Sequence, residues 1–173
     1  PSLERVTKGF LNLEKHIENC KHFGITPVVA INHFPSDSAE EIEFVQQQCS
    51  THGVKAKVAK GFELGGQGTT ELAQAVCDSI ESGANQFKPL YDWSLSIEDK
   101  IIKIATSIYG ATAVEFSSKA HTQLKTIKTL GYDKLPVCMA KTEKSLSDNM
   151  ELKGRPENFT VHVREFEFAA GAG

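Results

Sequence analysis

The stretch TPVVAINHFPSDSAEEIEFVQQQCSTHGVKAKVAKG, residues 26–61, decides the fold. Its apolar beginning, TPVVAIN (26–32), predicts a strand buried on both faces. The turn HFPSD follows, and Ser38 and Glu41 then have the spacing of a capping box, which predicts the start of a helix. VKAKVAKG (54–61) alternates apolar and basic residues and predicts a second strand near a sheet edge. This order of elements indicates a parallel β-α-β layer.

Helices are predicted on both sides of this layer. Apolar residues recur at spacings of three and four over residues 3–23, which indicates an amphipathic helix. After a glycine-rich turn, TTELAQAVCDSIESG (69–83) predicts another helix with an apolar face. That face consists of Leu72, Ala73, Val76, Cys77 and Ile80.

The second half of the chain has weaker patterns. We predict a helix from Ser96 to Gly110 and another over residues 117–130. LPVCMA (135–140) predicts a buried strand, and FTVHVREFEF (159–168) a strand with one wetter face. Between them, residues 141–158 form a long polar loop, typical of a functional or mobile segment. The expected fold class is therefore α/β, with a parallel layer flanked by helices in domain 1–90. A smaller α+β segment follows in domain 91–173, which holds a helical connector and an incomplete strand-containing subdomain.

Composition narrows the classes of function. The 173 residues are 40% hydrophobic and carry a formal net charge of −3, which is typical of a soluble globular protein and argues against nucleic acid as a partner. No apolar run is long enough to span a membrane, so no membrane partner is expected. The chain starts without methionine and stops after EFEFAAGAG, so we expect a piece of a longer protein. The scattered cysteines indicate buried or half-buried thiols in a reducing compartment rather than disulfides: Cys20, Cys49, Cys77 and Cys138.

The turn GFELGGQGTTELA (61–73) raises the question of a phosphate site. A glycine-rich turn before a helix can hold a phosphate, but a Walker A loop needs a lysine after its last glycine, and Thr69 stands there. GGQG does not fit the dinucleotide fingerprint either. The alternative is a tight turn whose backbone passes close to a ligand or another segment.

Two phenylalanines follow the two predicted strands. Phe34 stands before Pro35, and Phe62 after Gly61. Ligands of open α/β sheets bind beyond the carboxyl ends of the strands, where two aromatic rings can hold a planar ring between them. The alternative interpretation is that each phenylalanine covers the core beneath its own loop.

Other candidate groups are weaker. Lys141, Lys144 and Arg155 lie in or beside the polar loop and offer contacts to an anion, or are simply solvated charges. The histidines show no metal-binding spacing, so no metal site is expected: His16, His22, His33, His52, His121 and His162.

Several blocks in order resemble formate–tetrahydrofolate ligase. They are LNLEKHIENCKHFGITPVVAINHFPSDSAEEIEF, KPLYDWSLSIEDKI, IYGA, LPVCMAKTEKSLSDN, GRPENFTVHVRE and the closing GAG. The resemblance implies an enzyme that uses ATP to convert formate to formyl phosphate, which tetrahydrofolate then attacks to give 10-formyltetrahydrofolate. It also implies Mg²⁺ with ATP, a monovalent cation, a cytoplasmic location and a homotetramer.

The same resemblance assigns roles within this chain. The folate ring is held between two aromatic residues, which correspond to Phe34 in NHFPSD and Phe62 in GFELGGQG. The family usually has tryptophan at the second position, so Phe62 has a smaller ring and no indole N–H. Pro35 belongs to the same folate-binding set, and the glycines of the turn leave room for a ring edge: Gly65, Gly66 and Gly68.

The resemblance places the ATP-binding loop in a large N-terminal domain that this chain lacks. We therefore expect the isolated chain to be inactive and to contribute the folate side of the site. The alternative is a non-catalytic α/β binding or interaction module, which the loss of the tryptophan favours. A nucleotide-binding domain that uses the glycine turn would require ATP binding by this chain alone.

Overall fold

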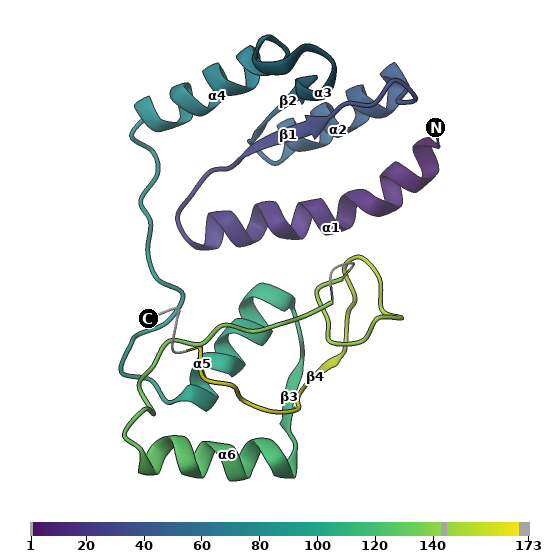
Figure 1. The fold of residues 1–173 in the computed structure, drawn as a ribbon. Helices are drawn as coiled ribbons and strands as arrows, with labels where there is room; N and C mark the ends of the chain where they lie inside the picture. Colours follow the sequence, from purple (N-terminus) through teal and green to yellow (C-terminus); the bar gives the residue numbers. More distant parts are fainter. Residues whose placement is uncertain (1, 143–144, 170–173) are drawn as a thin grey trace. The chain divides into compact units, whose positions relative to one another are not determined.

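The computed structural model describes residues 2–142 and 145–169. It consists of two compact units, Pro1–Lys88 (unit 1) and Pro89–Gly173 (unit 2), both visible in Figure 1. Each unit contains a parallel two-stranded sheet with helices packed on it. The predicted mixed α/β fold class is confirmed.

Unit 1 is built on two adjacent parallel strands. Val28 pairs with Lys55 at one end of the sheet, and Asn32 pairs with Ala59 at the other. The order of elements is α1 (Leu3–His22), β1 (Val28–Asn32), α2 (Ala39–Thr51), β2 (Lys55–Ala59), α3 (Gly61–Leu64), η1 (Gly65–Thr69) and α4 (Thr70–Glu81). Figure 1 shows β1 and β2 side by side, with α4 on one side of them.

Helix α2 begins at the predicted capping box. The Ser38 hydroxyl accepts a hydrogen bond from the Glu41 N–H at 3.3 Å, and the Glu41 carboxylate accepts one from the Ser38 N–H at 3.0 Å. The Ser2 N–H donates to the other oxygen of Glu41 at 2.5 Å. These backbone N–H donors lower the pKa of Glu41. The Ser38 N–H has the largest effect, and the Ser2 N–H comes next.

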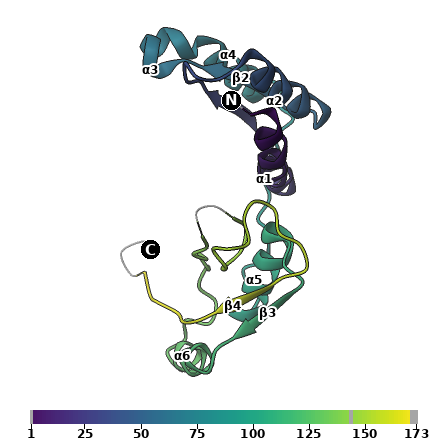
Figure 2. The same cartoon turned by 90° about the vertical axis from the view of Figure 1, so that its right-hand side faces the viewer.

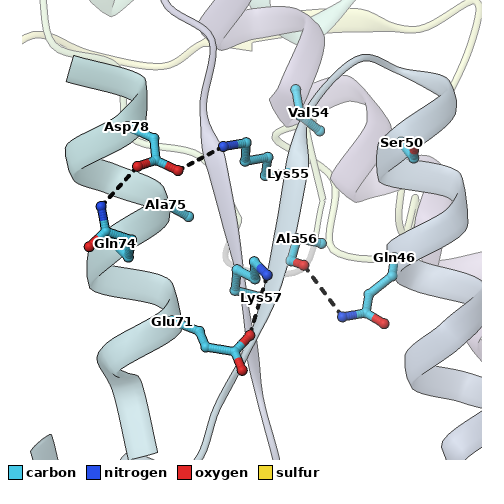
Figure 3. A pocket seen from close by; sticks show the side chains of 10 residues that line it. All are labelled: Gln46, Ser50, Val54, Lys55, Ala56, Lys57, Glu71, Gln74, Ala75 and Asp78. Carbon is cyan, nitrogen blue, oxygen red and sulfur yellow. Dashed lines mark hydrogen bonds and ion pairs between the residues drawn. The ribbon is translucent and has the colours of Figure 1, made fainter. Parts of the chain in front are cut away.

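The two faces of the unit 1 sheet differ in chemistry because β2 alternates apolar and basic residues. Val54, just before β2, and Ala56 pack into the unit 1 core with α1 and α2. Lys55 and Lys57 point to the opposite face, where α4 lies (Figure 3). The core itself consists of Phe10, Ile17, Cys49 and Val54, with Leu13, Val29, Phe44, Val45 and Ala56 packed against it.

The structure corrects two expectations for unit 1. Strand β1 is not buried on both faces, since Ala30 is exposed and Val29 only half-buried. On the face that carries Lys55 and Lys57, both lysines form ion pairs with residues of α4. The side chains of these ion pairs stay partly exposed to solvent. The thiol of Cys77 is exposed rather than buried, as is that of Cys138 in unit 2, although all the cysteines are free as predicted.

Unit 2 repeats the pairing of two parallel strands. Ala113 of β3 pairs with Thr160 of β4, and Phe116 with Val163. Its elements are α5 (Ile97–Ile104), the π-helical turn η2 (Ala105–Tyr109), β3 (Ala113–Phe116), α6 (Ser118–Thr129) and β4 (Thr160–Val163). Figure 2 shows β3 beside β4. Apolar residues of α5 and α6 pack together against the sheet: Ile97, Ile101, Leu124 and Ile127.

The predicted strand over 135–140 is absent, because side chains take the place of a neighbouring strand. Lys100 donates to the carbonyls of Lys134 and Leu135 at 2.8 and 3.1 Å. The Tyr91 hydroxyl accepts from the Val137 N–H at 3.3 Å, and the Tyr109 hydroxyl donates to the Met139 carbonyl at 3.3 Å. The segment is thus held without a β-ladder.

The strand predicted over 159–168 is shorter than expected. Only Thr160–Val163 pair with β3, which itself ends at Phe116. Beyond the ladder, the side-chain amide of Gln123 accepts from the Phe166 N–H at 2.9 Å and donates to the Phe166 carbonyl at 3.0 Å. The length of the partner strand therefore limits β4.

Candidate functional site

The first loop of the candidate site follows β1. The Asp37 carboxylate accepts from the Phe34 N–H at 2.8 Å, and the Asp37 N–H donates to the Phe34 carbonyl at 2.9 Å. Pro35 occupies the second position of this four-residue turn, where its fixed φ favours the turn. The turn runs directly into the capped start of α2 at Ser38. The backbone of Phe34 is thus fixed at both polar groups, while its side chain is 53% exposed.

The second loop follows β2 and is more helical than a simple turn. It consists of the single-turn helix α3 and the 3₁₀ helix η1. Phe62 lies in α3 and is 93% exposed. The chain changes direction at Gly65, whose φ of 57° and ψ of −140° suit glycine and no residue with a side chain. The loop therefore presents Phe62 to solvent.

The two loops meet at the carboxyl ends of the strands. The His33 N–H donates to the carbonyl of Ala59, the last residue of β2, at 3.1 Å. The His33 side chain is 16% exposed, and its Nδ1 lies 3.5 Å from Oε1 of Glu63. Nδ1 is shielded from solvent and has no hydrogen-bond partner in the described part of the chain. His33 and Glu63 thus connect the loops that carry Phe34 and Phe62.

Sequence reasoning missed this contact. His33 and Glu63 are distant in sequence, and no motif spacing connects them. The available signal was their position, since each is the immediate neighbour of one of the two phenylalanines. In parallel strands, residues that follow the carboxyl ends lie at the same edge of the sheet.

Part of the glycine turn is engaged in contacts within its own loop. The carbonyl of Gly68 accepts from the Lys60 N–H at 2.9 Å, and a Cβ at Gly68 would lie 2.4 Å from the Lys60 carbonyl oxygen. Gly68 is thus needed for packing inside the loop. The hydroxyls of Thr69 and Thr70 donate to carbonyls within the turn, those of Gly66 and Gln67. Gly65 and Gly66 face open space, where a Cβ would have no neighbour within 4 Å.

The predicted anion contacts, Lys141 and Arg155, lie in unit 2, whereas Phe34 and Phe62 lie in unit 1. The Lys141 ammonium donates to the carbonyls of Thr142 and Ser145 at 2.8 and 2.7 Å, so it stabilises its own loop. Arg155 is half-buried and follows Gly154, which bridges to Ser145. Lys144 lies outside the described residues. The loop is anchored by a buried segment, Ser145, Leu146 and Ser147.

An open groove of about 590 Å³ runs along the outer edge of β2 between α2 and α4 (Figure 3). Its charged groups are paired within the groove. Lys55 donates to Asp78 at 3.0 Å, and Lys57 to Glu71 at 3.3 Å. Hydrogen bonds from Gln74 and then Lys55 lower the pKa of Asp78. The groove is lined by Gln46, Ser50, Val54, Lys55, Ala56, Lys57, Glu71, Gln74, Ala75 and Asp78, and none of these is a predicted site residue.

Within residues 2–142 and 145–169, no three His, Cys, Asp or Glu side chains gather in a way that would hold a metal ion. The helices of the same residues include none with the length and apolar character needed to cross a bilayer.

The fold and the two strand-end loops define an α/β protein whose candidate ligand-binding residues follow the carboxyl ends of parallel strands. The family model for formate–tetrahydrofolate ligase matches residues 1–173, and the chain belongs to this family. The family's ligase reaction uses formate, tetrahydrofolate and ATP with Mg²⁺.

Proposed function

We propose that this chain supplies the tetrahydrofolate-binding side of a formate–tetrahydrofolate ligase active site. The observation that carries the proposal is the pair of exposed phenyl rings, Phe34 and Phe62, on the loops that follow two neighbouring parallel strands. Exposed aromatic rings at such an edge gain contact area when a flat ligand stacks on them. The pterin of tetrahydrofolate is such a ligand.

The loops favour stacking over phosphate binding. Pro35 and Asp37 fix the turn that carries Phe34, and Gly65 and Gly66 leave the backbone beside Phe62 open to a ring edge. Gly68 also supports the loop from inside, because a Cβ there would meet the Lys60 carbonyl, and it stays a proposed member of the folate-binding set. Lys141 and Arg155 remain proposed contacts for an anionic substrate group.

The ATP-dependent steps require groups outside this chain. The sequence of this chain contains no Gly-x4-Gly-Lys-[Ser/Thr] loop, and no lysine follows the last glycine of the glycine turn. We therefore propose that the chain alone does not catalyse the ligation, and that ATP, Mg²⁺ and the monovalent cation are bound mainly elsewhere in an intact enzyme. The proposal also includes that the intact enzyme is a homotetramer and that it is located in the cytoplasm.

Isothermal titration calorimetry of tetrahydrofolate into the 173-residue chain tests the folate-binding role. We expect saturable binding that Phe34→Ala or Phe62→Ala weakens about tenfold, since a stacked ring loses roughly 1.5 kcal/mol of contact. Phe62→Trp, which restores the larger ring, should tighten binding. The control is Phe87→Ala, which removes a 67% exposed ring that stacks on Phe23 near the start of β1.

Two results would contradict the proposal. Unchanged affinity in both Phe34→Ala and Phe62→Ala removes the rings from the site, and the absence of binding by the folded chain favours a non-catalytic interaction module. Formation of 10-formyltetrahydrofolate from ATP, formate and tetrahydrofolate by the chain alone would overturn the proposed inactivity.

A further inference from the structure

His33, the residue before Phe34, has one ring nitrogen that is enclosed by the protein and one that is open. Nδ1 is shielded from solvent and lies 3.5 Å from Oε1 of Glu63. Nε2 is not shielded, and it makes no hydrogen bond within residues 2–142 and 145–169. The exposed 16% of the side chain therefore includes Nε2. His33 thus directs one nitrogen to the protein and keeps the other for a further partner.

The carboxylate of Glu63 influences which nitrogen of His33 carries the ring proton. A neutral imidazole has one donor nitrogen and one acceptor nitrogen. With Nδ1 unprotonated, its lone pair would face a negatively charged oxygen 3.5 Å away, which is repulsive. With Nδ1 protonated, the same contact is attractive, as in the carboxylate–histidine pairs that orient metal-binding histidines. Neutral His33 therefore favours the Nδ1–H tautomer, in which Nε2 is a hydrogen-bond acceptor.

We propose that Nε2 of His33 accepts a hydrogen bond from an N–H group on the edge of the tetrahydropterin ring that stacks on Phe34 and Phe62. This inference rests on the folate-binding role proposed above. The edge of that ring carries an amino group and several ring N–H groups, so an acceptor beside the stacking residues matches it. Stacking accepts many flat rings of similar size, whereas a hydrogen bond to a defined edge selects among them. His33 is thus a specificity-determining residue, and Glu63 is the residue that positions it.

Protonation of His33 should reverse this recognition. Imidazole side chains take up a proton between about pH 8 and pH 5, and Nε2 then becomes a donor that meets another donor. Carboxyl and ammonium groups ordinarily titrate outside that range. The charged side chains of the two loops and of the first turns of α2 and α4 are all of these kinds: Asp37, Lys60, Glu63, Glu40, Glu41 and Glu71. A change in ligand affinity within that range therefore reports on His33.

Calorimetric titration of tetrahydrofolate into the chain from about pH 8 to about pH 5.5 tests the proposal. We expect the affinity to fall about three- to tenfold as the pH is lowered, which corresponds to the loss of one hydrogen bond. His33→Leu has no acceptor, so it should bind weakly throughout and show no pH dependence. His33→Gln keeps an acceptor that does not titrate, so it should retain most of the affinity across the range.

The matched control is His52→Gln. His52 also pairs with a glutamate, since its Nε2 lies 3.2 Å from Oε1 of Glu14, but it follows the last turn of α2 rather than a strand. This variant should keep the affinity and the pH profile of the wild type. Circular dichroism of each variant verifies the fold.

Nitrogen-15 NMR of the free chain gives a readout that does not depend on the ligand. In alkaline solution the shifts of His33 should show a protonated Nδ1 and an unprotonated Nε2, and Glu63→Gln should weaken this preference. The signals that His33→Leu removes identify the residue. A neutral His33 with its proton on Nε2 would overturn the proposal.

The binding data separate this inference from the folate-binding role. An affinity that Phe34→Ala weakens, but that His33→Leu and pH leave unchanged, would overturn the role of His33 alone. An affinity that rises as the pH falls would do the same. If the folded wild-type chain binds no tetrahydrofolate, the folate-binding role fails and the role of His33 fails with it.

Discussion

His33 Nδ1 lies 3.5 Å from Glu63 Oε1, and this contact connects the loop after β1 to helix α3 after β2. His33 precedes Phe34 and Glu63 follows Phe62 in sequence, so the contact lies directly beside both exposed rings. The contact therefore lies between the two backbone segments that carry the exposed rings.

Glu63→Ala should weaken tetrahydrofolate binding roughly threefold, because partly exposed pairs contribute about 0.2–1 kcal/mol. The melting temperature should change little. Calorimetric titration and a thermal melt measure the two effects. Glu43→Ala removes an exposed carboxylate from α2 and serves as the control. Equal affinities in the two variants would show that the His33–Glu63 contact does not position the rings.

Gly68→Ala should destabilise the chain by roughly 1–3 kcal/mol, since the new Cβ would lie 2.4 Å from the Lys60 carbonyl oxygen and force the loop to shift. Gly66→Ala in the same turn meets no atom within 4 Å and should change stability by less than about 0.5 kcal/mol. Urea unfolding compares the two variants. A Gly68→Ala chain as stable as Gly66→Ala would contradict the packing role of Gly68.

Stability should fall in acid partly through Glu41. Its pKa is lowered below the ordinary value of 4.5 by the Ser38 and Ser2 N–H groups, so the folded state favours the carboxylate. The contribution is fully present above pH 4.5 and is lost as pH falls through the lower, folded pKa. Glu41→Gln should therefore destabilise the chain most above that pH.

Urea unfolding of the wild type and Glu41→Gln across the acidic range measures this difference. Glu43→Gln, on the same helix, is the control and should leave the pH dependence as it is in the wild type. A difference between wild type and Glu41→Gln that stays constant with pH would argue against the proposed linkage.

Lys100→Met should destabilise unit 2 by roughly 1–3 kcal/mol, because the buried ammonium donates to the carbonyls of Lys134 and Leu135 and methionine cannot. Amide hydrogen exchange should increase at residues 134–139, which these contacts hold. Lys103→Met, on the same helix but exposed, is the control. Unchanged exchange in Lys100→Met would mean that the tyrosines alone hold the segment.

Local signals predicted unit 1 well. The capping box at Ser38 and Glu41, the two short strands and the glycine-rich turn all depend on residues close together in the chain. The segment at 135–140 was predicted wrongly because its composition matches a strand, while its partners are the side chains of Lys100, Tyr91 and Tyr109. A local sequence pattern cannot reveal such partners, because they are distant in the chain.

The sequence by itself determined the α/β class, the parallel order of β1 and β2, and the positions of Phe34 and Phe62 after those strands. These features follow from hydrophobic period and turn chemistry over a few residues. Only the tertiary structure decided that His33 meets Glu63 and that α4 turns Asp78 and Glu71 toward Lys55 and Lys57. Those contacts join residues distant in the chain, and their direction depends on which face of β2 each side chain occupies.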